Sequence, residues 1–166
     1  MDIKQIKYLG GIGATLVFFT IIPFVGFVAN ITGIVLMAIA FYQLANIINN
    51  KAIFNKFLIG LVLRMVGLII AIYVGLIFGL SYFFITNIPL TSVLSNINGA
   101  FLGIGVAILV WWILEIISAN FYAKSYKLVG DYFNRYLFNL TANFLFWGAV
   151  TAIVLVGFIL IFISNI

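Results

Sequence analysis

No charged residue occurs between Tyr8 and Asn50, and this run of 43 residues constrains the fold more than any other feature. A single helix of that length would measure about 65 Å at about 1.5 Å per residue. That is about twice the ~30 Å hydrocarbon core of a bilayer. We therefore expect two membrane spans joined by a turn. The segment IPFVG, which contains Pro23 and Gly26, predicts the turn, because proline disfavours helix in the residue before it and glycine permits a reversal.

The composition of the whole chain agrees with a membrane protein. Hydrophobic residues make up 66% of the sequence and charged residues only 7%, against about 45–50% and about 25% in soluble domains. The chain has no histidine and no cysteine, the residues on which zinc, haem and iron–sulfur sites mainly draw. Catalysis by a thiol or by a Ser–His–Asp triad is excluded for the same reason, because each needs a cysteine or a histidine. We expect an all-α polytopic membrane helix bundle that is not an enzyme and holds no cofactor.

Charges and turn-forming residues divide the chain into five predicted spans within a single transmembrane domain, residues 1–166. The polar, uncharged stretch 86–98 is predicted to be a loop, because it contains Pro89 and several asparagines. A cytoplasmic amphipathic segment is expected between the last two spans, over residues 120–137. The predicted spans are residues 8–22, 27–47, 57–84, 99–119 and 141–163.

The basic residues predict the orientation of these spans. All eight fall on one side of a five-span arrangement, and the positive-inside rule makes that side cytoplasmic. We therefore expect a multi-pass protein of a prokaryotic cell membrane, with the N-terminus inside and the C-terminus outside. The eight residues are Lys4, Lys7, Lys51, Lys56, Arg64, Lys124, Lys127 and Arg135.

Small residues recur on one face of the third span and at the start of the fourth. Such residues let membrane helices approach closely. They predict either packing within this chain or an interface with a partner or a second copy. The positions are Gly60, Gly67, Ala71, Gly75, Gly79, Gly99 and Gly103.

Two charges, Arg64 and Glu115, fall inside predicted spans. Intramembrane charges are functional hypotheses by default, and three roles are open: structural pairing, separate snorkelling to the interface, and transport or proton relay. Helical phase places Arg64 on the packing face with Gly67. Glu115 shares a face with Ile108 and Trp111, which suggests a lipid or partner surface. The phase therefore predicts that Arg64 and Glu115 do not pair.

The segment 120–137 places four charged residues on one helical face, at spacings of 3, 4 and 4. Its other face carries aromatic residues such as Tyr122 and Tyr126. We predict either an amphipathic helix on the inner leaflet, with its aromatic rings in the interface, or a solvated link between spans. A nucleic-acid partner is not expected, because membrane orientation already explains the basic residues. The predicted contacts with membrane lipids are Lys124, Lys127 and Arg135.

Two stretches carry a resemblance to a known family. The first contains GGIGATLVFFTIIPFVGFV, LMAIAFYQLAN and NNKAIFNKFLIG; the second runs from FYAKSYKLVG to LFNLTANFLFWGAVTAIVLVGFILIFI. Together they resemble uncharacterised multi-span membrane proteins of archaea and some bacteria, defined only as a domain of unknown function. The resemblance implies no activity and supplies no catalytic residue. Within the chain, GATLVFFTIIPFVGFVANI and GAVTAIVLVGFILIFISNI also look alike. This likeness predicts a duplicated hairpin, which would make Val156 and Gly157 a turn.

Two functions are consistent with these observations. The first is a non-catalytic membrane protein, either an accessory or structural subunit of a complex or a homo-oligomer that associates through the glycines. The second is a small transporter or channel for an ion or small solute, which would use Arg64 and Glu115.

Overall fold

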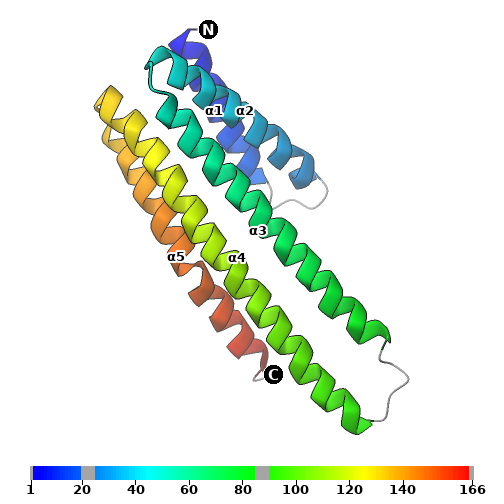
Figure 1. Ribbon diagram of the computed structural model, residues 1–166. Coiled ribbons are helices and arrows are strands. Elements are labelled where there is room, and N and C mark those ends of the chain that lie inside the picture. Colours follow the sequence, from blue (N-terminus) through cyan, green and yellow to red (C-terminus); the bar gives the residue numbers. More distant parts are fainter. Residues whose placement is uncertain (1, 20–24, 85–89, 165–166) are drawn as a thin grey trace. The chain divides into compact units, whose positions relative to one another are not determined.

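The computed structural model describes residues 2–19, 25–84 and 90–164, and their side chains over 2–17, 19, 26–77 and 104–154. The described chain is all-helical, as predicted (Figure 1). Four segments are long and apolar enough to cross a membrane, as judged by length and composition: Gly26–Ile47, Lys51–Ile77, Ile104–Phe133 and Tyr136–Val154. The helices are α1 (Ile3–Phe18), α2 (Val25–Ile47), α3 (Lys51–Phe84), α4 (Leu90–Phe133) and α5 (Tyr136–Ser164).

Asparagines in the left-handed conformation form two tight turns of the described chain. Asn49, with φ of 54°, ends the turn after α2, and Asn134, with φ of 50°, lies between α4 and α5. Asparagine tolerates this conformation better than most residues. The next residue donates back in each case: Asn50 N to Ala45 O at 2.9 Å, and Arg135 N to Gly130 O at 3.0 Å. Both connections therefore need only two or three residues outside the helices.

The structure corrects two expected boundaries at α4. The predicted loop 86–98 is wrong over residues 90–98, because α4 already begins at Leu90, and residues 86–89 lie outside the described part of the chain. In the sequence a proline directly precedes this helix, and proline is compatible with the start of a helix as well as with a loop. The expected separate amphipathic helix is instead the last part of α4, which runs without a break to Phe133. No residue between Ala119 and Phe133 forces a break, since an isolated glycine such as Gly130 is tolerated.

A third correction concerns α5. This helix is continuous from Tyr136 to Ser164, so residues 156 and 157 lie inside a helix and form no turn. The likeness between the two ends of the sequence therefore does not reflect a repeated helical hairpin.

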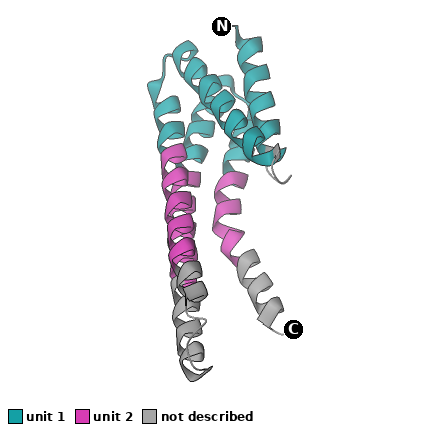
Figure 2. Ribbon diagram, turned by 90° about the vertical axis from the view of Figure 1, so that its right-hand side faces the viewer, with its two compact units in different colours: residues 1–59, 121–143 teal, residues 60–120, 144–166 magenta. Residues whose placement is uncertain are grey.

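The chain divides into two compact units (Figure 2). Unit 1 comprises Met1–Ile59 and Phe121–Asn143, and unit 2 comprises Gly60–Asn120 and Phe144–Ile166. Unit 1 contains nine of the eleven charged residues, and unit 2 contains the other two, Arg64 and Glu115. The single-domain assignment stays a prediction.

An aromatic cluster forms the core of unit 1. The rings of Phe41 and Phe57 stack at 4.4 Å, Tyr126 meets Phe41 edge-on at 5.1 Å, and Tyr122 meets Phe57 at 5.2 Å. Such pairs are worth about 0.5–1.5 kcal/mol each beyond their buried area. The expectation that Tyr122 and Tyr126 lie in the lipid interface is therefore wrong. Their face of α4 packs inward, against aromatic rings of α2 and α3.

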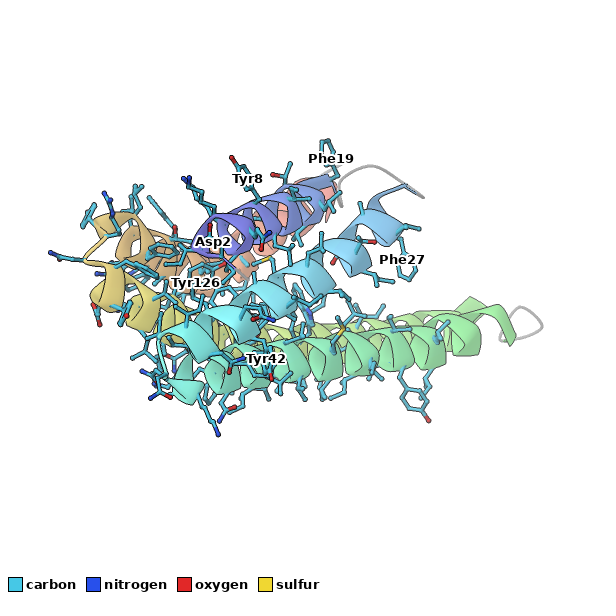
Figure 3. All side chains as sticks on the ribbon, turned by 90° about the horizontal axis from the view of Figure 1, so that it is seen from above. Asp2, Tyr8, Phe19, Phe27, Tyr42 and Tyr126 are labelled. Atoms are coloured by element: carbon cyan, nitrogen blue, oxygen red, sulfur yellow. The ribbon has the colours of Figure 1, made fainter. Side chains whose placement is uncertain are left out.

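Helices α1 and α2 cross at two glycines, Gly13 and Gly33. A Cβ atom on Gly33 would lie 2.6 Å from the carbonyl oxygen of Gly13, so the two backbones are in direct contact. The outer surface of this helix pair is apolar: Tyr8 is 70% exposed and Phe27 is 72% exposed. Figure 3 shows Tyr8 projecting outward from α1, Phe19 just after the end of α1, and Phe27 projecting from α2.

Candidate functional site

The two charges that fall inside predicted spans, Arg64 and Glu115, form a salt bridge in unit 2. Arg64 Nη2 lies 2.8 Å from Glu115 Oε1, and the two side chains are 51% and 14% exposed, respectively. The prediction that these residues do not pair is therefore wrong. Within the described residues, this ion pair is the one salt bridge of the molecule. It joins α3 to α4 in the stretch where both helices are otherwise uncharged.

The error came from the choice of packing face on α4. Gly67 packs against Trp111 and Leu114: a Cβ on Gly67 would lie 3.5 Å from Trp111 Cδ1 and 3.3 Å from Leu114 Cβ. Ser118 is fully buried on the same face. Glu115 lies four residues after Trp111 and three before Ser118, so it borders the face that meets α3. The face that suggested a lipid surface is thus the one that α3 covers.

A buried hydrogen bond supports the ion pair. Ser118 Oγ donates to the carbonyl oxygen of Gly60 at 2.7 Å. In an α-helix that carbonyl also accepts the backbone N–H of the residue four positions later, which is Arg64. The same turn of α3 therefore receives a hydroxyl and a carboxylate from one turn of α4. Where water is scarce, polar groups that satisfy one another in this way hold helices together.

Helix α5 joins this unit through an indole. Trp112 Nε1 donates to the carbonyl oxygen of Ala149 at 2.9 Å, and Ala149 is buried. Buried tryptophan side chains usually find such a partner. Unit 2 is thus held by polar contacts from α4 to both α3 and α5.

Unit 1 has a hydrogen bond of the same kind between α3 and α4. Ser125 Oγ donates to the carbonyl oxygen of Ile53 at 2.8 Å, and Ser125 is fully buried. Ser118 and Ser125 are seven residues apart on α4, and their acceptors, Gly60 and Ile53, are seven apart on α3. A seven-residue repeat keeps one helix face toward an antiparallel neighbour. The two serines thus mark the face of α4 that meets α3 in each unit.

The predicted small-residue positions have different surroundings. Gly60 and Gly67 are buried and Ala71 is half-buried, whereas Gly75 is exposed. No described atom lies within 4 Å of a Cβ placed on Gly75. The first part of the stripe is therefore covered within the described chain, and the role of the whole stripe as an interface stays a prediction. The positions that fall outside the described side chains are Gly79, Gly99 and Gly103.

The three residues predicted to contact lipid are all exposed: Lys124, Lys127 and Arg135. Lys124 Nζ lies 5.8 Å from the centre of the Phe121 ring, within reach of a cation–π contact. The predicted contact of these residues with lipid headgroups stays a prediction.

Two close approaches between helices were not predicted from the sequence. One is the Gly13–Gly33 crossing; the other is at Gly130, where a Cβ would lie 2.9 Å from Asn139 Oδ1. That oxygen is buried and has no hydrogen-bond partner within the described residues. A glycine in each of two neighbouring spans was a signal for the first approach. No pattern in the sequence signals the second.

The fold and the site define a helical protein with four segments suited to crossing a membrane and an ion pair within their apolar stretches. Over residues 29–166, the chain matches the family described as "Protein of unknown function (DUF996)", and it belongs to this family. It is similar to the uncharacterized protein MJ1644 of Methanocaldococcus jannaschii, at 32% identity over 167 residues. That match covers 100% of this chain and 89% of the archaeal protein. No solved structure matches the chain. The resemblance to an uncharacterised family is confirmed.

Proposed function

We propose that this protein is a non-catalytic structural component of a prokaryotic cell membrane that assembles with further copies of itself. It has five spans, with its N-terminus in the cytoplasm and its C-terminus outside. The observation that carries the proposal is the contrast between Gly67 and Gly75 on α3. Side chains of α4 occupy the space beside Gly67, whereas Gly75 is exposed and lies between large exposed apolar residues.

An exposed glycine on a membrane helix lets another helix approach its backbone. Ile72 is 53% exposed and Leu76 is 55% exposed, so the surroundings of Gly75 offer an apolar surface of varied height. Helices in lipid associate through such surfaces by van der Waals packing. The hydrophobic effect does not drive this association, because lipid tails are as apolar as the side chains that they cover. Among the described side chains of unit 2, Arg64 binds Glu115, and Ser118 and Trp112 donate to backbone carbonyls, which suits a structural role.

Leucine at Gly75 tests the proposal. We expect Gly75→Leu to lower the mass of the full-length protein in mild detergent from that of an oligomer to that of a monomer, with little change in its thermal midpoint. Gly67→Leu should lower the stability by about 1–3 kcal/mol, because its side chain would overpack against Leu114. Light scattering on a sizing column gives the mass, and thermal unfolding gives the midpoint.

Gly148→Leu is the matched control, because Gly148 is also exposed with no described atom within 4 Å of a Cβ. It should change neither mass nor midpoint. A wild-type chain that is monomeric in detergent and in nanodiscs would contradict self-association. If that monomer carries a stoichiometric partner protein, the role is that of an accessory subunit.

The second candidate function is a small transporter or channel, favoured by the salt bridge between Arg64 and Glu115 in apolar helices. Purified protein in liposomes would then carry a solute or ion flux that Arg64→Leu abolishes. The structural proposal expects no such flux from the wild-type chain.

The proposed topology has its own test. A cysteine in place of Ser92 should react with a membrane-impermeant thiol reagent in intact cells, whereas one in place of Asn50 should react only after the cells are opened. The chain has no native cysteine, so the background is clean. Labelling of Asn50→Cys in intact cells would rule out the cytoplasmic position of the α2–α3 turn.

A further inference from the structure

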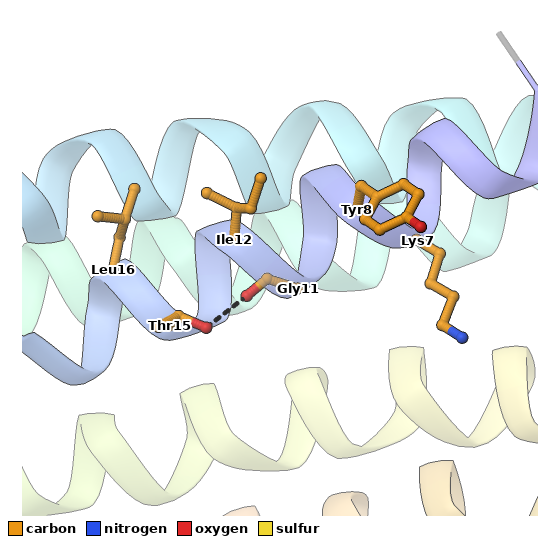
Figure 4. Close-up of a pocket in the computed structure, with 6 residues that line it drawn as sticks. All are labelled: Lys7, Tyr8, Gly11, Ile12, Thr15 and Leu16. Carbon is orange, nitrogen blue, oxygen red and sulfur yellow. Dashed lines mark hydrogen bonds between the residues drawn. The ribbon is translucent and has the colours of Figure 1, made fainter.

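A shallow groove of about 430 Å³ runs along the exposed side of α1. Figure 4 shows Lys7 and Tyr8 at one end of the groove and Thr15 and Leu16 at the other. Lys7 is exposed, and it makes no salt bridge within the part of the chain that the structure describes. The six residues that line the groove are Lys7, Tyr8, Gly11, Ile12, Thr15 and Leu16.

The floor of the groove is apolar, because the hydroxyl of Thr15 is already hydrogen-bonded to its own helix. Thr15 Oγ1 donates to the carbonyl oxygen of Gly11 at 2.9 Å, so the hydroxyl turns toward its own helix (Figure 4). Gly11 adds no side chain, and no described atom lies within 4 Å of a Cβ placed there. Ile12, at 53% exposure, forms one wall. The groove is therefore cationic at one end and apolar over the rest of its length.

We propose that this groove binds one anionic phospholipid of the inner leaflet. The phosphate lies at the Lys7 ammonium and the Tyr8 hydroxyl, and one acyl chain lies over Gly11 and Ile12 toward Leu16. Charge complementarity selects this occupant. Lys4 lies one turn before Lys7 on α1 and is also exposed, so two cations face the headgroup level.

A second copy of the chain fits this groove less well. Copies in one membrane share their orientation, so packing α1 against α1 would bring the two sets of Lys4 and Lys7 to the same depth. Like charges held together cost free energy rather than stabilise an interface. A lipid with an anionic headgroup reverses the sign of that interaction.

The test measures lipid retention on the full-length protein by native mass spectrometry. The probes are phosphatidylglycerol, phosphatidylcholine with the same acyl chains, and inorganic phosphate. We expect one retained phosphatidylglycerol, much weaker retention of phosphatidylcholine, and no retained phosphate. Lys7→Gln should weaken phosphatidylglycerol binding about fivefold, because one basic residue near the surface contributes about 1 kcal/mol. Gly11→Leu should weaken it at least as much, because its side chain fills the groove.

Two controls separate this site from general lipid binding. Lys51→Gln removes an exposed cation elsewhere in unit 1, and Gly148→Leu adds the same side chain at an open glycine on α5. Both should retain phosphatidylglycerol as the wild type does. Equal retention of phosphatidylcholine, or wild-type affinity in both Lys7→Gln and Gly11→Leu, would overturn the proposal. A change of oligomer mass in Gly11→Leu would assign the groove to a second copy instead.

Discussion

Gly33→Leu is expected to unfold the α1–α2 pair, with a loss of more than about 3 kcal/mol in the free energy of unfolding. A Cβ on Gly33 would lie 2.6 Å from Gly13 O and 2.9 Å from Val17 N. Both are backbone atoms, so no side-chain rotation relieves the overlap. Overpacking in a well-packed core typically costs about 1–3 kcal/mol and occasionally more. A leucine against a neighbouring backbone belongs at the upper end of that range.

The measurement is reversible unfolding of the full-length chain in mixed detergent, with Gly11→Leu as the matched control. Gly11 lies on the same helix as Gly13, two residues away, but a Cβ there meets no described atom within 4 Å. Gly11→Leu should therefore change the stability by less than about 0.5 kcal/mol. Gly13→Leu should resemble Gly33→Leu, because its Cβ would lie 2.8 Å from Gly33 O. If all three variants were equally stable, the glycine crossing would not exist in the protein.

The Gly13–Gly33 crossing is a contact that could not be predicted from the sequence. Gly13 and Gly33 each lie in an apolar run, and small residues there predict that some close approach occurs. Which residue meets which depends on the offset between two helices, and the offset follows from the length of the connection and from packing. Charge-free runs and turn residues, by contrast, depend only on neighbouring positions. They therefore predicted the helical class and the connection near Asn49. The turn at Asn134 was not predicted, because it lies inside the segment 120–137, which was expected to be one amphipathic stretch.

The α4 helix shows the same limit in another form. Asparagines and a proline before Gly99 predicted a loop, and local propensity alone favours one. In an apolar environment, however, unpaired backbone groups are costly, so a marginal segment is driven to complete its own helical hydrogen bonds. The aromatic face near Tyr126 predicts an interfacial position for a related reason. Its amphipathic pattern shows which side is apolar, but not whether lipid or protein covers that side.

A double-mutant cycle on Arg64 and Glu115 is the second large effect that we expect. The helical phase of the two residues predicted little coupling between them. The 2.8 Å contact instead predicts a coupling free energy of about 1–3 kcal/mol, as for residues in direct contact. The exposed half of Arg64 weakens the pair relative to a fully buried one, whose disruption costs about 3–5 kcal/mol. Apolar surroundings strengthen it relative to an exposed pair in water, which contributes about 0–1 kcal/mol.

Of the two single variants, Arg64→Leu should lose more stability than Glu115→Leu. Arg64→Leu leaves the Glu115 carboxylate, which is only 14% exposed, without its partner, so we expect a loss of about 3 kcal/mol. Glu115→Leu leaves Arg64 half-exposed on a long side chain that can extend toward the interface, so its loss should be nearer 1–2 kcal/mol. The double variant should lose less than the sum of the two, because neither charge is then stranded. Unfolding of the four proteins in one detergent measures the coupling. A value below about 0.5 kcal/mol would mean that the two side chains lie apart in the membrane and that Ser118 alone ties this turn of α4 to Gly60.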